Sequence, residues 1–462
     1  MSGKRPNLLF IMDDQHRHDW LGCATDGARH VRTPHIDALA ARGTRFTQTI
    51  TSAPLCAPSR IGLASGCEPP RFGVLSNDAY LPLSPQTTPY YARLRDSGYR
   101  VGCVGKLDLA KPDGYNGRDG DLPRTFSWGF THPVECEGKM HAGSSITPIG
   151  PYTNWLAQCG LLKAFHRDYA VRRGDSIRQC HDSVLPTEAF EDCYIGRRSA
   201  RWIDDISDDA PWHLSVSFVG PHDPFDPPEE YSRRWRKISM PDAISGDCED
   251  AKCKPNWIRQ RDLGLSAAEV EVTRRQYSAA VECIDDQVGL ILDAVERRGM
   301  MDDTVIVFSS DHGEMLGDHG LYAKACAYEA SLRIPLILAG PGLPAGAVSD
   351  ALVELIDLNP TLCELAGLPE QKGIDARSFL PVLRGEEREH REVQAAALAG
   401  FRCVRTREWK WIDNGREGNE LYHLQSDPEE VHNVVGDHLG AVTELTAKLR
   451  KHYLWDPTDA YR

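Results

Sequence analysis

Two acidic segments of the sequence carry side chains that could bind a metal ion. Asp13 and Asp14 directly follow a short apolar run, and Asp311 and His312 follow another. Two adjacent carboxylates repel each other, so a cation is their natural companion. Aspartate oxygen and imidazole nitrogen are both metal ligands. The two segments together therefore predict a site for a divalent cation.

Each of these segments also has a simpler interpretation. An isolated Asp-Asp pair is more often a turn in which one aspartate caps the following helix. The segment around His312 could equally be a capping loop with a solvated histidine. The metal hypothesis gains weight because two such segments occur, and both follow a predicted strand.

A nucleophile is predicted at the start of a short helix. Pro58 suits the first turn of a helix that continues through Leu63, which places Cys56 at its amino end. Free N–H groups and the helix dipole favour an anion at that position. Arg60 adds a fixed cation that could hold a sulfate oxygen or a metal-bound nucleophile. The segment is suited to attack on an anionic ester, although a buried structural thiol is the default for a cysteine in a chain that has 14.

The elements that must position these residues alternate along the chain. Short strands are predicted at residues 8–12, 101–104, 214–219, 305–308 and 336–338. Apolar residues at spacings of three and four predict a long helix from Tyr277 to Val295 that is stopped by Gly299, and a second helix covers residues 36–42. This alternation predicts an α/β fold with a mostly parallel central sheet flanked by helices. Ligands of such sheets bind beyond the carboxyl ends of the strands, where both acidic segments lie.

Two further regions differ from this pattern. Residues 107–186 are rich in Gly, Pro, Trp and charged residues, so we expect loops that cover the strand ends and shape a substrate site. After Gly385, alternating segments at residues 401–404 and 409–412 lead into a final helix at residues 442–453. We therefore predict a catalytic domain at residues 1–385 and a small C-terminal α+β domain, built on an antiparallel sheet, at residues 386–462.

Composition excludes several classes of protein. The chain has 53 Lys and Arg against 67 Asp and Glu, a net charge of −14, and no long basic cluster, so nucleic acid is not the expected partner. The apolar run near the start is too short for a signal peptide or a membrane span. The cysteines are scattered without Cys-x-x-Cys spacing. We expect no membrane contact and a cytoplasmic location, or a periplasmic or secreted one if a leader has been removed.

A family resemblance rests first on the segment Cys56-Ala57-Pro58-Ser59-Arg60, with Ser65-Gly66 downstream. It resembles the signature of the type I, formylglycine-dependent sulfatases, which belong to the alkaline phosphatase superfamily. Matching segments cover nearly the whole chain, at residues 6–15, 33–37, 104–106, 220–224, 311–324, 420–422 and 427–433. The resemblance implies an alkaline phosphatase-like fold and a sulfuric ester hydrolase.

The resemblance also implies a metal centre. By position, Asp13, Asp14, Asp311 and His312 are similar to the family's metal ligands, joined by the modified Cys56. The family usually holds calcium, so one Ca²⁺ is expected. Many members place Asn where this chain has His312, and because imidazole is softer than an amide oxygen, Mg²⁺ or Mn²⁺ is the alternative.

The family's cysteine is oxidised to formylglycine, so the resemblance implies that Cys56 becomes 3-oxoalanine through a formylglycine-generating enzyme. The hydrated aldehyde then attacks sulfur, because the metal lowers the pKa of one hydroxyl. Arg60, Lys106 and Lys324 would neutralise the sulfuryl oxygens. His222 and Lys324 resemble the groups that bind sulfate and protonate the leaving alcohol.

One residue departs from the family pattern. Many sulfatases read Gly-Lys-x-His where this chain reads Gly105-Lys106-Leu107-Asp108. That histidine is the family's usual base for collapse of the sulfated hemiacetal. A carboxylate can also accept a proton, so Asp108 is predicted to act either as this base or as a substrate contact.

The predicted function is hydrolysis of a sulfate ester, of a carbohydrate or another small organic molecule, to an alcohol and inorganic sulfate. The first alternative is a phosphonate monoester or phosphodiester hydrolase of the same superfamily. The second is a catalytically silent protein that binds sulfated ligands, which is suggested by the residue at position 108. It is disfavoured because every residue type of the metal site and the nucleophile is present.

Overall fold

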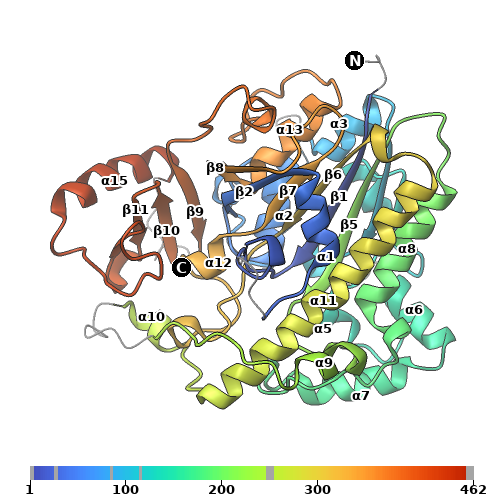
Figure 1. Cartoon of the computed structure of the whole chain (residues 1–462), viewed down its shortest axis with the longest axis horizontal. Helices are drawn as coiled ribbons and strands as arrows, with labels where there is room; N and C mark the ends of the chain where they lie inside the picture. The colour runs from blue at the N-terminus through green and yellow to red at the C-terminus, as the bar shows by residue number, and fades with distance from the viewer. Residues whose placement is uncertain (1–4, 25–29, 84–86, 114–116, 246–253, 454–462) are drawn as a thin grey trace.

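The computed structural model describes residues 5–24, 30–83, 87–113, 117–245 and 254–453. A large sheet of eight strands forms the centre of the molecule (Figure 1), in the order β4-β3-β5-β1-β6-β7-β2-β8. Only β7 runs antiparallel to its neighbours among these strands, so the predicted mostly parallel sheet is confirmed. The strands are β1 (Asn7–Asp14), β2 (Gly43–Ile50), β3 (Arg100–Gly105), β4 (His132–Glu135), β5 (Trp212–Pro221), β6 (Thr304–Ser310), β7 (Leu336–Ala339) and β8 (Ala347–Glu354).

Helices cover both faces of this sheet because its central strands β1, β5 and β6 are buried on both sides. In β1, Leu8 and Phe10 point into a core that includes side chains of α2, α3 and α13. Leu9 and Ile11 point into the opposite core, with α1, α8 and α11. The helices of the central region are α1 (Pro34–Ala41), α2 (Cys56–Ser65), α3 (Tyr90–Asp96), α8 (Glu191–Asp205), α9 (Glu229–Trp235), α10 (Asn256–Arg259), α11 (Ala267–Arg297), α12 (Glu329–Leu332), α13 (Leu358–Leu365) and α14 (Leu380–Leu383). No described helix is both long enough and apolar enough to cross a membrane.

The long helix predicted around Tyr277 is α11. It begins with a capping box, in which the Ser266 hydroxyl accepts from the Glu269 backbone N–H and the Glu269 carboxylate accepts from Ser266 N. It ends before Gly299, whose φ of 63° is the left-handed conformation that glycine adopts readily. The prediction of this helix is confirmed.

The region expected to form loops contains more regular structure than the sequence pattern suggested. Residues 107–186 include β4 and the helices α4 (Pro123–Trp128), α5 (Lys139–Ala142), α6 (Pro151–Gln158) and α7 (Leu162–Arg172). These helices are short, and in α7 the apolar residues Leu162, Phe165 and Tyr169 recur at spacings of three and four and pack into the α11 side of the core. Tertiary burial stabilises turns that are too short to form alone.

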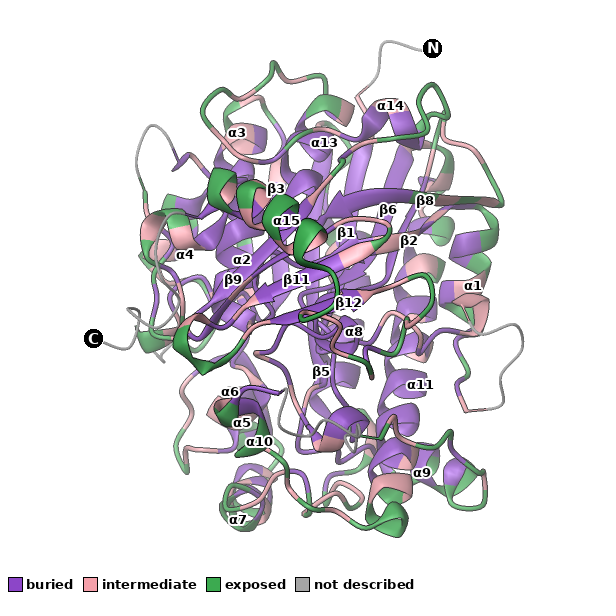
Figure 2. Cartoon of the chain, turned by 90° about the vertical axis from the view of Figure 1, so that its left-hand side faces the viewer, coloured by how far each residue is buried: buried purple, intermediate pink, exposed green. Residues whose placement is uncertain are grey.

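A second sheet follows the catalytic elements. Its antiparallel strands are β9 (Gln394–Leu398), β10 (Phe401–Arg405), β11 (Trp409–Asp413) and β12 (Glu420–His423), in the order β12-β11-β10-β9. The final helix, α15 (Leu439–His452), packs on one face and leaves an exposed outer side (Figure 2). The other face packs against residues around α12. The predicted boundary after Gly385 falls between α14 and β9, and its position stays a prediction.

Buried ion pairs join the small sheet to the central region. Arg405 of β10 and Lys410 of β11 lie 2.8 and 2.6 Å from carboxylate oxygens of Glu329 in α12. Lys410 also lies 2.6 Å from Glu430. Removal of one partner would leave a buried charge without compensation, so these contacts hold α12 and the sheet in one arrangement.

A pH-dependent contact joins α15 to the segment after α2. His452 Nδ1 lies 2.9 Å from Glu68 Oε1, and this hydrogen bond raises the pKa of His452. Stability from a raised histidine pKa is present below the unfolded value of about 6.5 and is lost as pH rises through the folded value. We expect His452→Gln to lower the free energy of unfolding by at most about 1 kcal/mol at about pH 6 and by nothing at about pH 9. Urea unfolding at the two pH values measures this, and an equal loss at both would contradict it.

Candidate active site

The side chains predicted to do chemistry meet at one edge of the large sheet. Strands β3, β5, β1 and β6 are neighbours and parallel, so their carboxyl ends lie side by side. Asp14 ends β1, and three further predicted residues directly follow the other strands: Lys106 after β3, His222 after β5 and Asp311 after β6.

Gly105 allows Lys106 to leave its strand at this edge. Its φ is 109°, and a Cβ at this position would lie 1.9 Å from the carbonyl oxygen of Ser217. No residue with a side chain fits this close approach of two strands. The glycine therefore directs the following lysine toward the end of β1.

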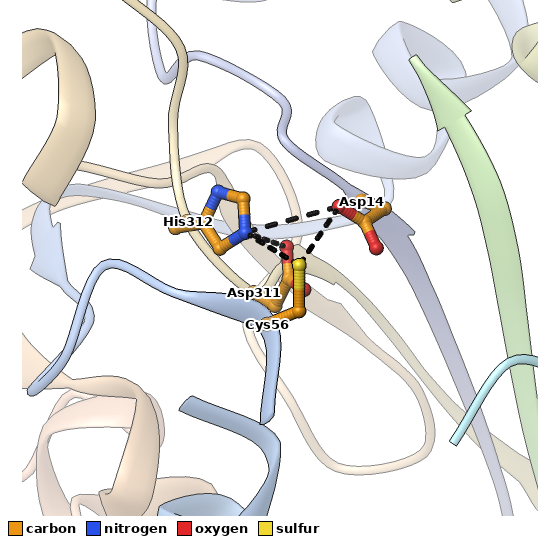
Figure 3. A group of neighbouring side chains, drawn as sticks. All are labelled: Asp14, Cys56, Asp311 and His312. Atoms are coloured by element: carbon orange, nitrogen blue, oxygen red, sulfur yellow. Dashed lines mark hydrogen bonds and ion pairs between the residues drawn. The ribbon is translucent and has the colours of Figure 1, made fainter. Parts of the chain in front are cut away.

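Asp14, Cys56, Asp311 and His312 form a buried group at this edge, which we call the four-residue group (Figure 3). Their ligand atoms all lie within 4.8 Å of one another. His312 Nε2 lies 3.4 Å from Cys56 Sγ, 3.8 Å from Asp14 Oδ1 and 3.5 Å from Asp311 Oδ1. This convergence from β1, α2 and the end of β6 is what a metal site requires.

Cys56 is the first residue of α2, as predicted, and its side chain is fully buried. Burial raises the pKa of a thiol, but the positive charges of Lys106, Lys111 and Lys324 outweigh it, so the Cys56 pKa lies well below its usual range. A reactive, anionic group is therefore favoured at this position. Its sulfur marks the place where the oxygen atoms of a modified residue 56 would lie.

Arg60, one turn along α2, ties the group together. Its Nε donates to Asp311 Oδ2 at 2.8 Å, and its Nη2 donates to Asp14 Oδ2 at 3.1 Å. Its Nη1 donates at 2.7 Å both to the carbonyl of Lys106 and to the Ser217 hydroxyl. One buried guanidinium thus orients both carboxylates of the group.

Lys106 approaches the group from the other side. Its Nζ lies 2.5 Å from Asp14 Oδ2 and 3.1 Å from Asp108 Oδ2. Burial lowers the pKa of Lys106, but these two carboxylates outweigh it and hold that pKa well above its usual value. Lys106 therefore stays charged at the end of β3, which suits a role in neutralising an anionic substrate.

His222 and Lys324 form a pair beside the group. Lys324 Nζ lies 2.5 Å from His222 Nε2 and also donates to Gln15 Oε1. His222 Nδ1 lies 2.6 Å from the carbonyl oxygen of Asp223, which fixes the ring. Both residues are predicted from the sequence to bind sulfate and protonate the leaving alcohol. The structure places them in contact although they lie 102 positions apart.

Asp13 lies outside the four-residue group. The carboxylate of Asp13 is directed to His16, and the pairing of β1 with β5 is irregular between Met12 and Asp14. Asp13 Oδ2 lies 2.5 Å from His16 Nδ1, and its Oδ1 is buried without a hydrogen-bond partner. Asp13 is thus the predicted metal ligand that lies outside the four-residue group, and its role as a ligand stays a prediction.

A cavity of about 550 Å³ opens beside the group. Lys106 and His222 belong to its wall, and so does Asn77, whose Oδ1 accepts from the backbone N–H of Ala57 next to Cys56. The remaining lining residues are Asp108, Ala110, Lys111, Pro112, Arg124, Glu135, Cys136, Gly138, Lys139, Met140, His141, Ser144 and Val219. Most come from residues 107–186, which the sequence predicted to shape the substrate site.

Sequence reasoning missed several residues of this site. Gln15 donates its backbone N–H to Asp311 Oδ1 at 3.1 Å and contacts Lys324, and its position directly after Asp14 could have indicated it. Asn77, Lys111 and His141 reach the cavity from segments without a recognisable motif. No local signal in the sequence distinguishes them from surface residues.

The donor set fits a divalent cation. Asp14 and Asp311 supply carboxylate oxygens, His312 supplies an imidazole nitrogen, and all are removed from solvent. The carboxylates of Asp14 and Asp311 and an anionic residue 56 face two nearby cations, Arg60 and Lys106, and Lys106 is shared with Asp108. A bound cation would complete this balance.

Comparison with known proteins identifies the family. A family model described as Sulfatase matches residues 6–368, and one described as N-sulphoglucosamine sulphohydrolase, C-terminal, matches residues 317–455. The chain is 30% identical to a choline-sulfatase of Rhizobium meliloti over 96% of this chain and 85% of the relative. It is 28% identical to an N-acetylglucosamine-6-O-sulfatase of Bacteroides thetaiotaomicron over 94% of this chain and 83% of the relative.

The phosphonate monoester hydrolase of Agrobacterium radiobacter has a similar structure. The two share a TM-score of 0.81 and 26% identity, with 97% of this chain and 96% of that chain covered. The alkaline phosphatase-like fold, with its separate small antiparallel sheet, is thus common to both. With the sulfatase model covering most of the chain, the protein belongs to the sulfatase family of the alkaline phosphatase superfamily and is a sulfuric ester hydrolase.

Proposed function

We propose that the chain hydrolyses the sulfate ester of a carbohydrate or another small organic molecule, with residue 56, converted to formylglycine, as nucleophile. The observation that carries this proposal is the position of Cys56. It starts α2, is fully buried, and lies 3.4 Å from His312 Nε2 and 3.8 Å from Asp14 Oδ1 within the four-residue group. A nucleophile at that point can be activated by a metal, and Asn77, which accepts from the backbone N–H of the next residue, lines the adjoining cavity.

The chain's own residues supply the rest of the site. Arg60 holds Asp14 and Asp311 in place, so that their second oxygens remain directed at the metal position. Lys106 and Lys324 present ammonium groups to the oxygens of a bound sulfate, where charge develops during transfer. The pair of His222 and Lys324 protonates the leaving alcohol, and the proton comes from the Lys324 ammonium, because His222 donates its Nδ1 proton to the Asp223 carbonyl and accepts from Lys324 at Nε2.

Asp14, Asp311 and His312 would hold one divalent metal ion with residue 56. The metal, when bound, lowers the pKa of a hydroxyl on residue 56 and polarises the sulfate. We propose Ca²⁺ as the resident ion, with Mn²⁺ or Mg²⁺ as the alternative that an imidazole ligand permits. Thermal unfolding of chelated protein with each ion tests this, since a ligand at 100 times its Kd stabilises by about 2.7 kcal/mol.

The residues that line the cavity favour a substrate whose leaving group is polar. Its volume of about 550 Å³ is in the range of small-molecule sites. The described residues of its lining include no Trp, Tyr or Phe, the side chains that recognise a quaternary ammonium group. This favours a sugar sulfate, as in the relative that is an N-acetylglucosamine-6-O-sulfatase, over choline sulfate.

The second candidate is a phosphonate monoester hydrolase, which the structural similarity to that enzyme of Agrobacterium radiobacter favours. Steady-state rates on an aryl sulfate and the matching aryl phosphonate ester, measured with metal-loaded and modified protein, separate the two. We expect the higher kcat/KM for the sulfate. A clear preference for the phosphonate would replace the proposal by this second candidate.

A further inference from the structure

The proposed function requires a base that regenerates residue 56 after sulfuryl transfer, and none of the residues assigned so far serves as that base. Asp108 stands where many sulfatases carry the histidine that acts as base, but its carboxylate lies 3.1 Å from Lys106 Nζ and 2.9 Å from Lys111 Nζ. Burial would raise the Asp108 pKa, yet the two ammonium groups outweigh burial and lower it. A carboxylate held in this way is a weak base. Asp108 is therefore a positioning residue, which fixes two lysines on the cavity wall.

A histidine lies elsewhere in the same cavity. His141, on α5, lines the cavity together with Lys106, Asp108 and His222. Its backbone makes the helical contacts of α5, but within the described residues its imidazole makes no hydrogen bond to the protein. An imidazole in a cavity wall without a protein partner is available to a substrate or to a reacting group.

Two contacts anchor the turn that carries His141. A Cβ at Gly138, which directly precedes α5, would lie 3.3 Å from Cδ and Cε of Lys106, so this end of the turn packs against the sulfate-binding lysine. Lys139 Nζ donates to the carbonyl oxygens of His222 at 3.1 Å and Pro224 at 2.9 Å. Helix α5 is thus tied to the residues after both β3 and β5, the strand ends that carry Lys106 and His222.

We propose that His141 is the catalytic base that regenerates residue 56, in place of the histidine that the sequence motif lacks. The inference rests on the proposed function. After sulfuryl transfer, the side-chain carbon of residue 56 bears one sulfate and one hydroxyl group. A nitrogen of neutral His141 takes the hydroxyl proton, the O–H electrons form the aldehyde C=O bond, and the C–O bond to sulfate breaks. Sulfate leaves with that electron pair, and the imidazolium returns its proton to water.

The surroundings of His141 set its protonation state. Burial lowers its pKa, and the cations that face it are Lys111, Arg124 at the start of α4 and Arg173 after α7, which lower it further. Asp108 acts in the opposite direction. The lowered pKa keeps the imidazole neutral at pH 7. We therefore expect kcat to stay constant as the pH falls to about 6.5, the usual pKa of histidine, and to decrease only at lower pH.

The experiment compares His141→Gln with His132→Gln, a variant of a histidine on β4 that faces Trp202 and lies outside the cavity. Both are tested as metal-loaded protein with residue 56 converted, on an aryl sulfate. We expect His141→Gln to release one equivalent of phenol rapidly and then turn over about 100-fold or more slowly. Intact mass should show one sulfuryl group retained on the protein. His132→Gln should match the parent.

Further variants separate a proton-transfer role from a structural one. In His141→Ala, added imidazole should restore part of the steady turnover rate, because it can occupy the space of the lost ring. Asp108→Asn should raise KM and slow the first phase, since it loosens Lys106 and Lys111, without accumulation of sulfated protein. Unchanged steady turnover in His141→Gln, or sulfated protein that accumulates in Asp108→Asn instead, would overturn the assignment.

Failure of the proposed function gives a different result. If the protein hydrolyses the ester while the mass of the Cys56 peptide shows an unmodified thiol, residue 56 is not a formylglycine nucleophile, and the role of His141 is overturned with it. If the peptide carries the aldehyde and His141→Gln turns over as fast as the parent, the proposed function stands and another residue is the base.

Discussion

Cys56→Ala is expected to abolish turnover of an aryl sulfate, with kcat reduced by roughly 10⁴-fold or more. The substitution removes the nucleophile and leaves α2 intact, because alanine is a good helix former and Cys56 is the first residue of that helix. Steady-state kinetics with metal-loaded protein measures the loss. Peptide mass spectrometry of the parent chain, made with a formylglycine-generating enzyme, should show an aldehyde at residue 56.

Cys403→Ala is the matched control. Cys403 is also buried, but it lies on β10 in the small sheet. Its loss should cost stability through a small cavity and leave kcat unchanged. A Cys56→Ala protein with the parent's turnover would show that another group attacks the ester, and an unconverted thiol in the parent would favour the phosphohydrolase or the silent binder.

Arg60→Ala is expected to lower the free energy of unfolding by about 3–5 kcal/mol and to weaken metal binding. Arg60 is buried and donates to both Asp14 and Asp311, so its removal leaves Asp311 without this cation and Asp14 with Lys106 as its remaining cation. Their mutual repulsion then opposes folding of the metal-free protein. Urea unfolding gives the first effect, and calorimetric titration with Ca²⁺ or Mn²⁺ gives the second.

Arg391→Ala is the control that separates the loss of stability from the loss of metal affinity. Arg391 is an equally buried arginine that donates to both oxygens of Asp357, its Nε at 2.7 Å and its Nη2 at 2.5 Å, and it contacts no residue of the four-residue group. We expect a comparable loss of stability with unchanged metal affinity. If Arg60→Ala retained the parent's metal affinity, the view that Arg60 orients the ligands would be wrong.

Much of the fold followed from local pattern. The β1 segment around Leu9 reads as a strand buried on both faces, and α11 carries a helical apolar stripe, a capping box and a terminal glycine. Strands β2 and β8 were missed because their residues alternate with polar ones and their pairing partners are distant in sequence. Short helices such as α5 were missed because tertiary contacts stabilise them.

The site, like the fold, could be predicted from the sequence only in part. The order of residues along the chain was enough to predict that Cys56, Arg60 and acidic residues at the ends of β1 and β6 form one site, and their roles as nucleophile, cation and metal ligands stay predictions. It was enough because strand ends of a parallel sheet meet at one edge and because an α-helix N-terminus favours an anion. Each of these rules is applied to a short segment of the chain, and the regular geometry of a parallel sheet then brings the segment ends together.

Which side chains face the site was decided by tertiary structure. The end of β1, where its pairing with β5 is irregular, directs Asp14 to Cys56 and Asp13 to His16, a choice that a pair of identical residues cannot reveal. Asp108 is fixed between Lys106 and Lys111 by the turn that follows β3. His141 reaches the cavity because α5 is anchored to two strand ends far apart in sequence. Such long-range contacts depend on how the whole sheet and its covering segments pack, so no local pattern of residues encodes them.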